Sequence, residues 1–400
     1  MKTNQQKLKE NIPKFYLFEV LYSLMFYTPI IVLFFQKNGL SLTEVMVIQF
    51  INSVLWILME IPAGYFADVM GRKISMMMTG IFATLSMLTF GLGTNFYHFL
   101  IGSLLWALTG VFLSGADSAF IYDTLKDLNR EGEYKKIWGK TFFYANIGMA
   151  TAGIIGGFLA GMNFRYPFFV VLPIYIFLIP LALSFHEPKK HRTVSVLTHV
   201  SELFKAIKTT IFQNKKLKWL LLYSGLMMSV ISIAYYLYQP YLKLSGLDLV
   251  YFGFVFAAFN VIEAFSAKYA HRIEKKVGPN FSLIFLFILI GLCYLLMGNI
   301  IFIFSFVFAF ILQFVRGFSS IVISDYIHKV TDSKIRATVL SVESFTKRGF
   351  CAILVPIIGW LLGIYSLPQT LTMIGIMTLV VGGVFAVMLW KNRVVEKDTV

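Results

Sequence analysis

Charged residues are scarce in this sequence, and acidic residues are scarcer than basic ones. The 400 residues include 20 Asp and Glu and 35 Lys and Arg; 14% of the chain is charged, 58% is hydrophobic and the mean hydropathy is +0.75. Soluble globular proteins carry about 25% charged residues, so this composition excludes a soluble fold of this size. Apolar runs of about 20 residues match the length of a helix that crosses a ~30 Å hydrocarbon core. The composition therefore predicts an all-α integral membrane protein.

Cysteine and the motifs of catalysis are also scarce. The two cysteines, Cys293 and Cys351, both fall in apolar runs, which excludes a disulfide framework or a cysteine metal site. The six histidines include no pair at metal-ligand spacing deep in an apolar run. Trp138-Gly139-Lys140-Thr141 is similar to the end of a phosphate-binding loop, but Tyr134 stands where the first Gly is required. We therefore expect no cofactor, no metal, no enzyme activity and no ATP-driven transport.

Twelve apolar runs are the candidate membrane-spanning helices. They cover residues 15–36, 43–63, 74–94, 99–123, 138–161, 167–185, 218–240, 249–269, 281–299, 301–324, 339–362 and 368–390. Most Lys and Arg residues then fall on the side of the N-terminus, whereas Lys37, Arg165 and Lys243 fall on the other. By the positive-inside rule, both termini of this multi-pass protein are cytoplasmic and it lies in the cell membrane. The net charge of +15 is then a topology signal, and we expect no nucleic-acid partner.

One long connection divides the chain into two halves. Residues 186–217 form a basic cytoplasmic linker between an N-terminal six-helix bundle, residues 1–185, and a C-terminal six-helix bundle, residues 218–400. Within the linker, Val200 to Phe212 has helical periodicity with basic residues on one side, which predicts an amphipathic helix on the membrane surface. The basic run binds either lipid headgroups or a soluble partner.

The two halves resemble each other weakly. An offset of 207 residues pairs Gly39-Leu40 with Gly246-Leu247, Gly71 with Gly278, and Gly110 with Gly317. Such matches favour an internal repeat of the kind that many transporters contain.

A short polar segment joins the second and third apolar runs. It reads Gly64-Tyr65-Phe66-Ala67-Asp68-Val69-Met70-Gly71-Arg72-Lys73. Gly64 and Gly71 let two helix ends approach closely, and Asp68 can lie by a neighbouring helix's N-terminus while Arg72 and Lys73 stay cytoplasmic. The segment therefore predicts a compact turn that acts as a hinge or latch.

With twelve spans, a central loop and this hinge, the sequence resembles the major facilitator superfamily (MFS) of secondary transporters. Gly64, Asp68, Gly71, Arg72 and Lys73 match the family's G-x-x-x-D-x-x-G-R-K signature between helices 2 and 3. The resemblance covers essentially all 400 residues and implies two six-helix bundles that rock about a central cavity. It also implies that an acid at the end of the fourth span pairs with Arg72, and Asp123 stands there.

Two further segments qualify the resemblance. The second-half copy of the signature, around His271 to Gly278, has lost the acid–base pattern, so we expect the latch to be asymmetric. The fifth span, from Gly148 to Gly161, is similar to the glycine-rich helix of the family's drug exporters, but Ala152-Gly153 occupies the expected Gly-Pro. Close helix packing also explains these glycines.

The resemblance implies that helices 1, 4, 7 and 10 line the cavity. Helical spacing places polar and aromatic residues on one face of each of these helices. The predicted cavity residues are Glu19, Tyr22, Phe26, Ser114, Asp117, Ser232, Tyr235, Tyr236, Gln239, Gln313, Arg316 and Ser320. Two further intramembrane acids, Glu60 and Glu263, belong to helices nearer the interface between the halves.

Acids inside the hydrocarbon are costly, by about 2.5–3.5 kcal/mol on insertion scales, so each must face a cavity or a partner. A carboxyl in a partly dry cavity gains affinity for a proton through desolvation and loses it beside a base. Glu19 is interpreted as a proton or cation carrier, as one member of a static ion pair, or as a surface acid. Asp117 is either a second coupling acid or an ion-pair partner, and Arg316 either pairs with Asp117 or Glu19 or binds an anionic substrate.

These observations predict a proton-coupled antiporter that exports small amphipathic, drug-like compounds, as in multidrug efflux. Its expected partners are membrane lipid, a small-molecule substrate and the proton, and we expect a monomer. Uptake of a nutrient or metabolite is the alternative within transport. A lipid-translocating or non-transporting membrane protein of the same fold is the alternative from another class.

Overall fold

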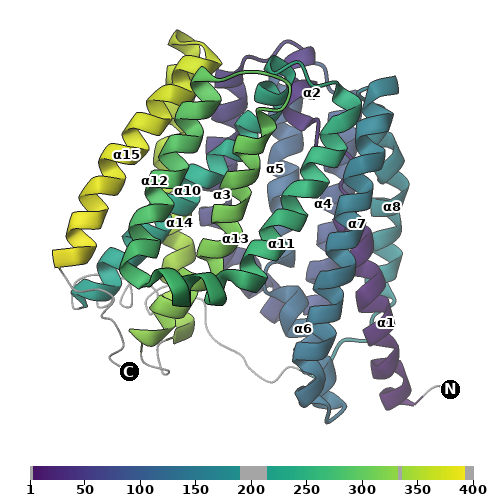
Figure 1. Ribbon diagram of the computed structural model, residues 1–400. Coiled ribbons are helices and arrows are strands. Elements are labelled where there is room, and N and C mark those ends of the chain that lie inside the picture. Colours follow the sequence, from purple (N-terminus) through teal and green to yellow (C-terminus); the bar gives the residue numbers. More distant parts are fainter. Residues whose placement is uncertain (1–2, 190–213, 332–335, 392–400) are drawn as a thin grey trace. The chain divides into compact units, whose positions relative to one another are not determined.

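The computed structural model describes residues 3–189, 214–331 and 336–391, and within these ranges every regular element is a helix. The first group of helices comprises α1 (Asn4–Ser23), α2 (Ile31–Lys37), α3 (Leu42–Met70), α4 (Arg72–Leu92), α5 (Phe96–Leu113), α6 (Ala116–Asp127), η1 (Glu131–Glu133), α7 (Tyr134–Met162) and α8 (Tyr166–Leu183). The second comprises α10 (Lys215–Leu244), η2 (Leu249–Tyr251), α11 (Phe252–Val277), α12 (Pro279–Asn299), α13 (Phe306–Lys329), α14 (Arg336–Ile364) and α15 (Leu367–Lys391). Figure 1 shows most of them as long helices. The amphipathic helix predicted at Val200 to Phe212 lies outside the described residues.

Eleven helical segments in the described ranges are long and apolar enough to cross a membrane, with α5 and α6 counted together. The first predicted span, residues 15–36, is not among them because it is not one helix. It consists of α1 and α2, separated by a non-helical segment at Leu24–Ile30. Pro29 lies in that segment and has no backbone N–H to donate.

Local signals in the sequence fix several helix starts. Ser41 and Glu44 form a capping box at the start of α3, in which each side chain accepts a hydrogen bond from the other's backbone N–H. Asn95 caps α5 and Asn214 caps α10 more simply: the side-chain oxygen of each accepts one hydrogen bond, from the backbone N–H of His98 and of Leu217 respectively. These caps satisfy N–H groups that have no partner within the helix.

The chain divides into two compact units. The first comprises Met1–Leu40, Ile51–His199 and Leu249–Ala257, and the second comprises Ser41–Phe50, Val200–Asp248 and Ala258–Val400. The boundary between Phe50 and Ile51 divides α3, and the boundary between Ala257 and Ala258 divides α11. The first turns of each of these helices thus pack in a different unit from the rest of the helix.

In the first unit, small residues let α4 pack closely between α5 and α8. Gly102 of α5 faces the ring of Phe90 on α4, and Gly80 of α4 faces Ile179 on α8. Rings of Phe34, Phe35, Phe99 and Phe168 fill the space around Phe90. This aromatic core accounts for part of the high Phe content that the sequence shows.

The glycines of α7 serve backbone packing on two sides. A Cβ at Gly156 would collide with the backbone carbonyl of Phe26, in the non-helical segment after α1. On the other side, a Cβ at Gly157 would lie 3.0 Å from the carbonyl of Val250, which belongs to the same unit. The packing interpretation of the glycine-rich fifth span is therefore confirmed.

In the second unit, α12 packs along α15 and α10 packs along α14. A Cβ at Gly375 of α15 would lie 2.8 Å from the carbonyl of Gly291 on α12, so both helices need glycine at this contact. Tyr223 of α10 is fully buried, and its hydroxyl donates a hydrogen bond to the carbonyl of Leu283 on α12. These contacts place α10 in the centre of its unit.

The backbone supports the internal repeat at an offset of 207. Gly39 and Gly246 have φ values of +94° and +84° after α2 and α10, and Gly71 and Gly278 have φ values of +105° and +85° before α4 and α12. Hydrogen bonds repeat as well: Leu40 N–H donates to Phe35 at 3.1 Å, and Leu247 N–H donates to Leu242 at 3.2 Å. Glycine is needed at all four positions because these φ values are unfavourable for residues with a Cβ.

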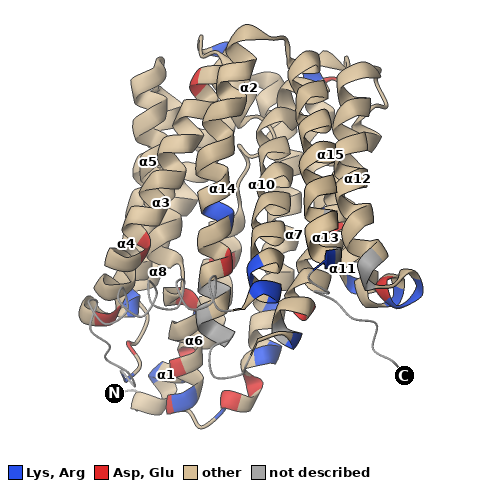
Figure 2. Ribbon diagram, turned by 90° about the vertical axis from the view of Figure 1, so that its left-hand side faces the viewer, with Lys and Arg blue, Asp and Glu red and all other residues tan. Residues whose placement is uncertain are grey.

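Charged side chains are concentrated toward one end of the helices of each unit (Figure 2). Two of the three bases expected at the other end are held within the protein. Arg165 donates hydrogen bonds to the carbonyls of Gly91 and Gly93, at the end of α4, and to the side chain of Asn38 at 3.2 Å. The Lys37 ammonium lies 4.3 Å from the centre of the Phe164 ring.

Candidate transport site

Glu19 lies in the last turns of α1, directly before the break in the first span. Its Oε1 is buried and has no hydrogen-bond partner among the described residues. After Ser23 the chain leaves the helix, and the hydroxyl of Tyr175 on α8 donates to the carbonyl of Tyr22 at 3.3 Å. Interrupted membrane helices expose backbone groups at mid-membrane depth, and in transporters they mark binding sites.

Asp117 lies beside a second break. Helix α5 ends at Leu113, Gly115 has a φ of +80°, and α6 begins at Ala116. Asp117 is therefore in the first turn of α6, where the positive end of the helix dipole favours a carboxylate. Its Oδ1 accepts a hydrogen bond of 2.5 Å from the backbone N–H of Ser118.

The structure brings these two predicted acids together. Glu19 and Asp117 lie on helices α1 and α6, which pack against each other, and the two carboxyls are close enough for their charges to interact. Within the first unit, neither carboxylate forms an ion pair with a Lys or Arg of the described residues. Two neighbouring carboxyls with no base in their own unit are costly to ionise together, so such a pair favours the binding of a proton or a cation.

Aromatic side chains form one wall beside Glu19. The ring of Trp106 on α5 stacks on Tyr22 with centroids 6.0 Å apart and on Tyr175 with centroids 6.1 Å apart. Tyr27 meets the same indole edge-on at 5.5 Å. The sequence analysis predicted Tyr22 but missed Trp106 and Tyr175, although Trp106 lies two helical turns before Ser114 on the fourth span.

The remaining predicted cavity residues of the first unit differ in exposure. Ser114 is exposed at the end of α5, as a lining residue requires. Phe26 is buried at 7% exposure, in the segment that packs against Gly156. Phe26 therefore packs inside the protein and holds the non-helical segment between α1 and α2 against α7.

In the second unit, Arg316 has a partner that the sequence did not predict. Its Nε lies 3.4 Å from Oε1 of Glu263 on α11. The contact arises because Gly317 lets α13 approach α11 closely: a Cβ at Gly317 would collide with the carbonyl of Glu263. Both side chains stay about one third exposed or more, so the pair faces open space.

Other predicted residues of the second unit fall into two groups. Ser320 is exposed, and Ser232, Tyr235 and Tyr236 are half-buried. Gln239 and Gln313 are buried, and Gln313 donates to the hydroxyl of Tyr238 at 3.2 Å. The two glutamines therefore lie in the interior of the unit, and Gln313 contributes to the packing of α13 against α10.

A buried acid in α14 escaped the sequence analysis. Glu343 is 8% exposed, and its Oε1 lies 3.0 Å from Nζ of Lys347 and accepts a hydrogen bond of 2.8 Å from Ser224 on α10. The acid, the base and the hydroxyl form a polar contact between α10 and α14. An Asp or Glu inside a predicted span and one turn from a Lys was the available signal.

The hinge is shorter than predicted. Helix α3 continues through Gly64 to Met70, so the turn is confined to Gly71 and α4 starts at Arg72. Residues 64–70 stay helical because a single glycine with a positive φ is enough to reverse the chain. An added Cβ at Gly64 would meet nothing within 4 Å, so Gly64 does not provide the close approach expected of it.

The ion pair expected between Arg72 and Asp123 is present. Arg72 Nη1 contacts Asp123 Oδ2 and also donates to the carbonyl of Ala119 at 2.6 Å, which ties α4 to α6. The second half has a different contact at this level, in which the hydroxyl of Tyr326 on α13 donates to Glu274 on α11 at 2.8 Å. The two contacts differ as the sequence predicted for an asymmetric latch.

The start of α4 is capped by a residue that the sequence analysis missed. Glu187, which follows α8, accepts hydrogen bonds from the backbone N–H groups of Arg72 at 2.8 Å and Lys73 at 2.9 Å. Asp68, which was expected to lie by a helix N-terminus, lines the small space that Glu187 also lines. Glu60 is exposed near the middle of α3.

Comparison with known proteins finds similarity to membrane transporters. The sequence model of the Major Facilitator Superfamily matches residues 16–348. YxaM of Bacillus subtilis (strain 168), described as an uncharacterized MFS-type transporter, is 24% identical over 273 residues, which are 66% of this chain and 67% of YxaM. Multidrug resistance protein 2 of the same strain is 30% identical over 162 residues, which are 37% of each chain.

Solved transporter structures are similar in fold. The nucleoside transporter NupG superposes with a TM-score of 0.78 at 14% identity, over 97% of this chain and 99% of NupG. A D-xylose-proton symporter superposes with a TM-score of 0.68 at 13% identity, over 94% of this chain and 96% of the symporter.

Proposed function

Because the chain belongs to the major facilitator superfamily, we propose that it is a proton-coupled secondary transporter that exports small amphipathic compounds from the cytoplasm. Family membership makes the chain a membrane transporter and not an enzyme. Direction, coupling ion and substrate class are the proposed parts.

The observation that carries the proposal is the pair of acids at two helix breaks. Glu19 and Asp117 lie close together on α1 and α6, no described Lys or Arg of the first unit forms an ion pair with either, and Glu19 Oε1 lacks a hydrogen-bond partner among the described residues. Two buried carboxyls cannot both stay ionised cheaply, so one of them holds a proton or a cation. A cationic substrate that enters the site takes the place of that proton, which couples the two movements.

The aromatic wall suits an amphipathic cation. Trp106 and Tyr22 are half-buried and present stacked rings beside Glu19, with the fully buried Tyr175 packed behind Trp106; such rings bind apolar and cationic groups. The printed name of one relative, Multidrug resistance protein 2, supports export of compounds of this kind.

The proposed architecture has twelve spans in two six-helix bundles. With α1 and α2 counted as one broken span, and α5 and α6 as another, the labelled helices amount to twelve. The bundles are proposed to comprise residues 1–185 and 218–400, with residues 186–217 as a cytoplasmic linker. Both termini are proposed to lie on the cytoplasmic side of the cell membrane, because most Lys and Arg residues fall there.

The hinge is proposed to act as the cytoplasmic gate. The Arg72–Asp123 pair and the Glu187 cap hold α4, α6 and the segment after α8 together near Gly71. Alternating access requires such contacts to form in one state and break in the other.

Dye accumulation in everted membrane vesicles tests the proposal. Vesicles that contain the chain are expected to accumulate ethidium and tetraphenylphosphonium when energised, and a protonophore is expected to stop this. Glu19→Gln should abolish the accumulation, whereas Glu60→Gln, which removes an exposed acid from the same unit, should not. Accumulation that resists the protonophore would reject proton coupling.

The orientation of the vesicles separates export from uptake. Accumulation in right-side-out vesicles, and not in everted ones, would reverse the proposed direction and favour a nutrient or metabolite importer. Failure of both probes in both orientations would reject amphipathic cations as the substrate class.

A further inference from the structure

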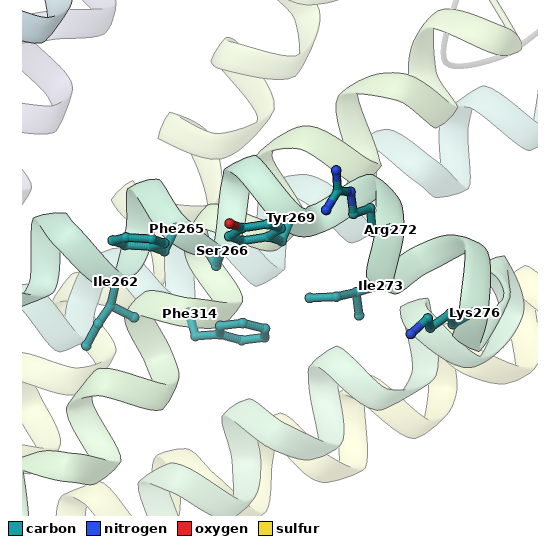
Figure 3. Close-up of a pocket in the computed structure, with 8 residues that line it drawn as sticks. All are labelled: Ile262, Phe265, Ser266, Tyr269, Arg272, Ile273, Lys276 and Phe314. Atoms are coloured by element: carbon teal, nitrogen blue, oxygen red, sulfur yellow. The ribbon is translucent and has the colours of Figure 1, made fainter.

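A groove of about 520 Å³ lies between α11 and α13 in the second unit. Figure 3 shows Phe314 of α13 on one side and a row of α11 residues on the other, from Ile262 and Phe265 to Arg272 and Lys276. The 15 residues from Ile262 to Lys276 extend ~21 Å along the helix, at ~1.5 Å for each step, which is about one bilayer leaflet and its headgroup. The groove is therefore long enough to take one chain of a lipid.

The internal repeat explains why the groove is open. In the first half, Met59 and Phe66 of α3 pack against a cluster formed by Ala63, Val111 and Phe112. At the offset of 207 residues, Ser266 and Ile273 replace Met59 and Phe66, and both line the groove. The smaller side chains leave unfilled the space that the first half fills.

The groove and the Arg316–Glu263 pair lie on opposite sides of the α11–α13 contact. Phe314 and Arg316 are two residues apart, which is about 200° around a helix, and so are Glu263 and Phe265. Residues seven positions from Phe314, namely Val307 and Ile321, are 46% and 45% exposed. An exposed apolar stripe of this kind on a membrane helix contacts lipid, so the groove opens toward the bilayer.

The charged end of the groove has an excess of positive charge. Arg272 and Lys276 line it, and neither forms an ion pair with an Asp or Glu of the described residues. In the first half, the equivalent positions are Tyr65 and Val69, so the bases belong to the second half alone. Arg272 also lies over the Tyr269 ring, 5.7 Å from its centre, which fixes the direction of the guanidinium.

We propose that this groove binds an anionic phospholipid of the bilayer. An acyl chain lies against Ile262, Phe265 and Phe314, and the headgroup phosphate lies between Arg272 and Lys276. Basic pockets at the cytoplasmic ends of membrane helices bind anionic headgroups, because the cytoplasmic leaflet is rich in them. The site is separate from Glu19 and Asp117, and it does not depend on the proposed transport activity.

Site-specific photocrosslinking to lipid tests the proposal. The full chain, with benzoylphenylalanine at Phe265 or Phe314, is reconstituted in vesicles of equal parts phosphatidylglycerol and phosphatidylcholine with the same acyl chains. The matched position is Val387 on α15, which is also exposed, at 49%. We expect phosphatidylglycerol adducts to exceed phosphatidylcholine adducts at the groove positions by up to about 30-fold, since each base near the surface contributes a factor of about five. At Val387 the two adducts should be equal.

Charge variants then assign the preference to the two bases. Arg272→Gln with Lys276→Gln should remove the preference at Phe265. The double variant Lys268→Gln with Lys275→Gln removes the same amount of charge from exposed residues of α11 that do not line the groove. This variant should keep the preference for phosphatidylglycerol. Ile273→Phe, which restores the first-half residue, should reduce adducts of both lipids at Phe314.

Three results would overturn the proposal. If phosphatidylglycerol and phosphatidylcholine form adducts in equal yield at Phe265, as expected at Val387, the groove contacts bulk lipid only. A preference that persists in the Arg272/Lys276 double variant would show that these two bases do not form the site. The same conclusion would follow if the Lys268/Lys275 double variant lost the preference to the same extent.

Discussion

Lys347 Nζ lies 3.0 Å from Oε1 of Glu343 one turn earlier on α14, and the hydroxyl of Ser224 on α10 donates to the same oxygen at 2.8 Å. The acid is 8% exposed, while the lysine side chain is 36% exposed. The base can therefore hydrate if the pair breaks, but the acid and the serine cannot. The contact depends on Glu343 more than on Lys347.

We expect Glu343→Ala to lower the melting temperature of the protein in detergent more than Lys347→Ala does. Glu343→Ala leaves the buried Ser224 hydroxyl without its acceptor and costs about 1–3 kcal/mol, or roughly 2–10 °C. Glu343→Gln keeps an acceptor for Ser224 and should cost less. Thermal unfolding followed by tryptophan fluorescence provides the measurement, and equal losses for Glu343→Ala and Lys347→Ala would contradict the asymmetry.

Proton release on substrate binding should depend on Glu19 and Asp117 jointly. Because the two acids interact, Glu19→Gln or Asp117→Asn alone should remove most of the release that tetraphenylphosphonium causes, and the double variant should add little. The pH change in a weakly buffered detergent solution measures this. Additive losses from the two single variants would mean that the acids act independently.

Glu187→Ala should loosen the start of α4. The variant removes the acceptor for two backbone N–H groups at the positive end of a helix, so we expect a cost of about 1–2 kcal/mol and a melting temperature lower by about 2–8 °C. Glu131→Gln, at an exposed residue in η1, is the matched loss of one acid and should change the melting temperature little. Equal melting temperatures for the two variants would contradict the capping role of Glu187.

Two glycines of α7 should respond in opposite ways to alanine. Gly156→Ala places a methyl group in the backbone of Phe26, so we expect it to abolish transport or folding. An added Cβ at Gly139 meets nothing within 4 Å, so Gly139→Ala should raise helix stability by up to about 1 kcal/mol. Expression level and thermal unfolding compare the two, and a tolerated Gly156→Ala would require the segment after α1 to move.

The sequence predicted the helices well and their interruptions poorly. Runs of about 20 apolar residues identify membrane helices because the bilayer sets their length. The break after α1 depends on a contact between the Phe26 backbone and Gly156, and no local pattern encodes a contact between residues so far apart. Helix α3 extends to Met70 because Gly71 alone forms the turn, whereas the polar residues before it suggested an earlier end.

The acids of the site could be predicted, but their partners could not. Glu19 and Asp117 are conspicuous because ionisable residues are rare in apolar runs. The partner of Arg316 follows from the close approach of α11 and α13 at Gly317, which only the packed helices reveal. Glu343 was missed because Lys347 and Arg348 make its surroundings look like a helix end at the membrane surface.

Arg165 has a consequence for how this chain enters the membrane. If both termini are cytoplasmic, as we propose, Arg165 lies on a segment that is translocated during synthesis, and its charge opposes the orientation that the other bases favour. In the folded protein the same group is engaged by the carbonyls of Gly91 and Gly93 and by Asn38. With the proposed topology, we expect the α7–α8 hairpin to cross the membrane before Arg165 engages these carbonyls, so that one side chain sets an order of assembly.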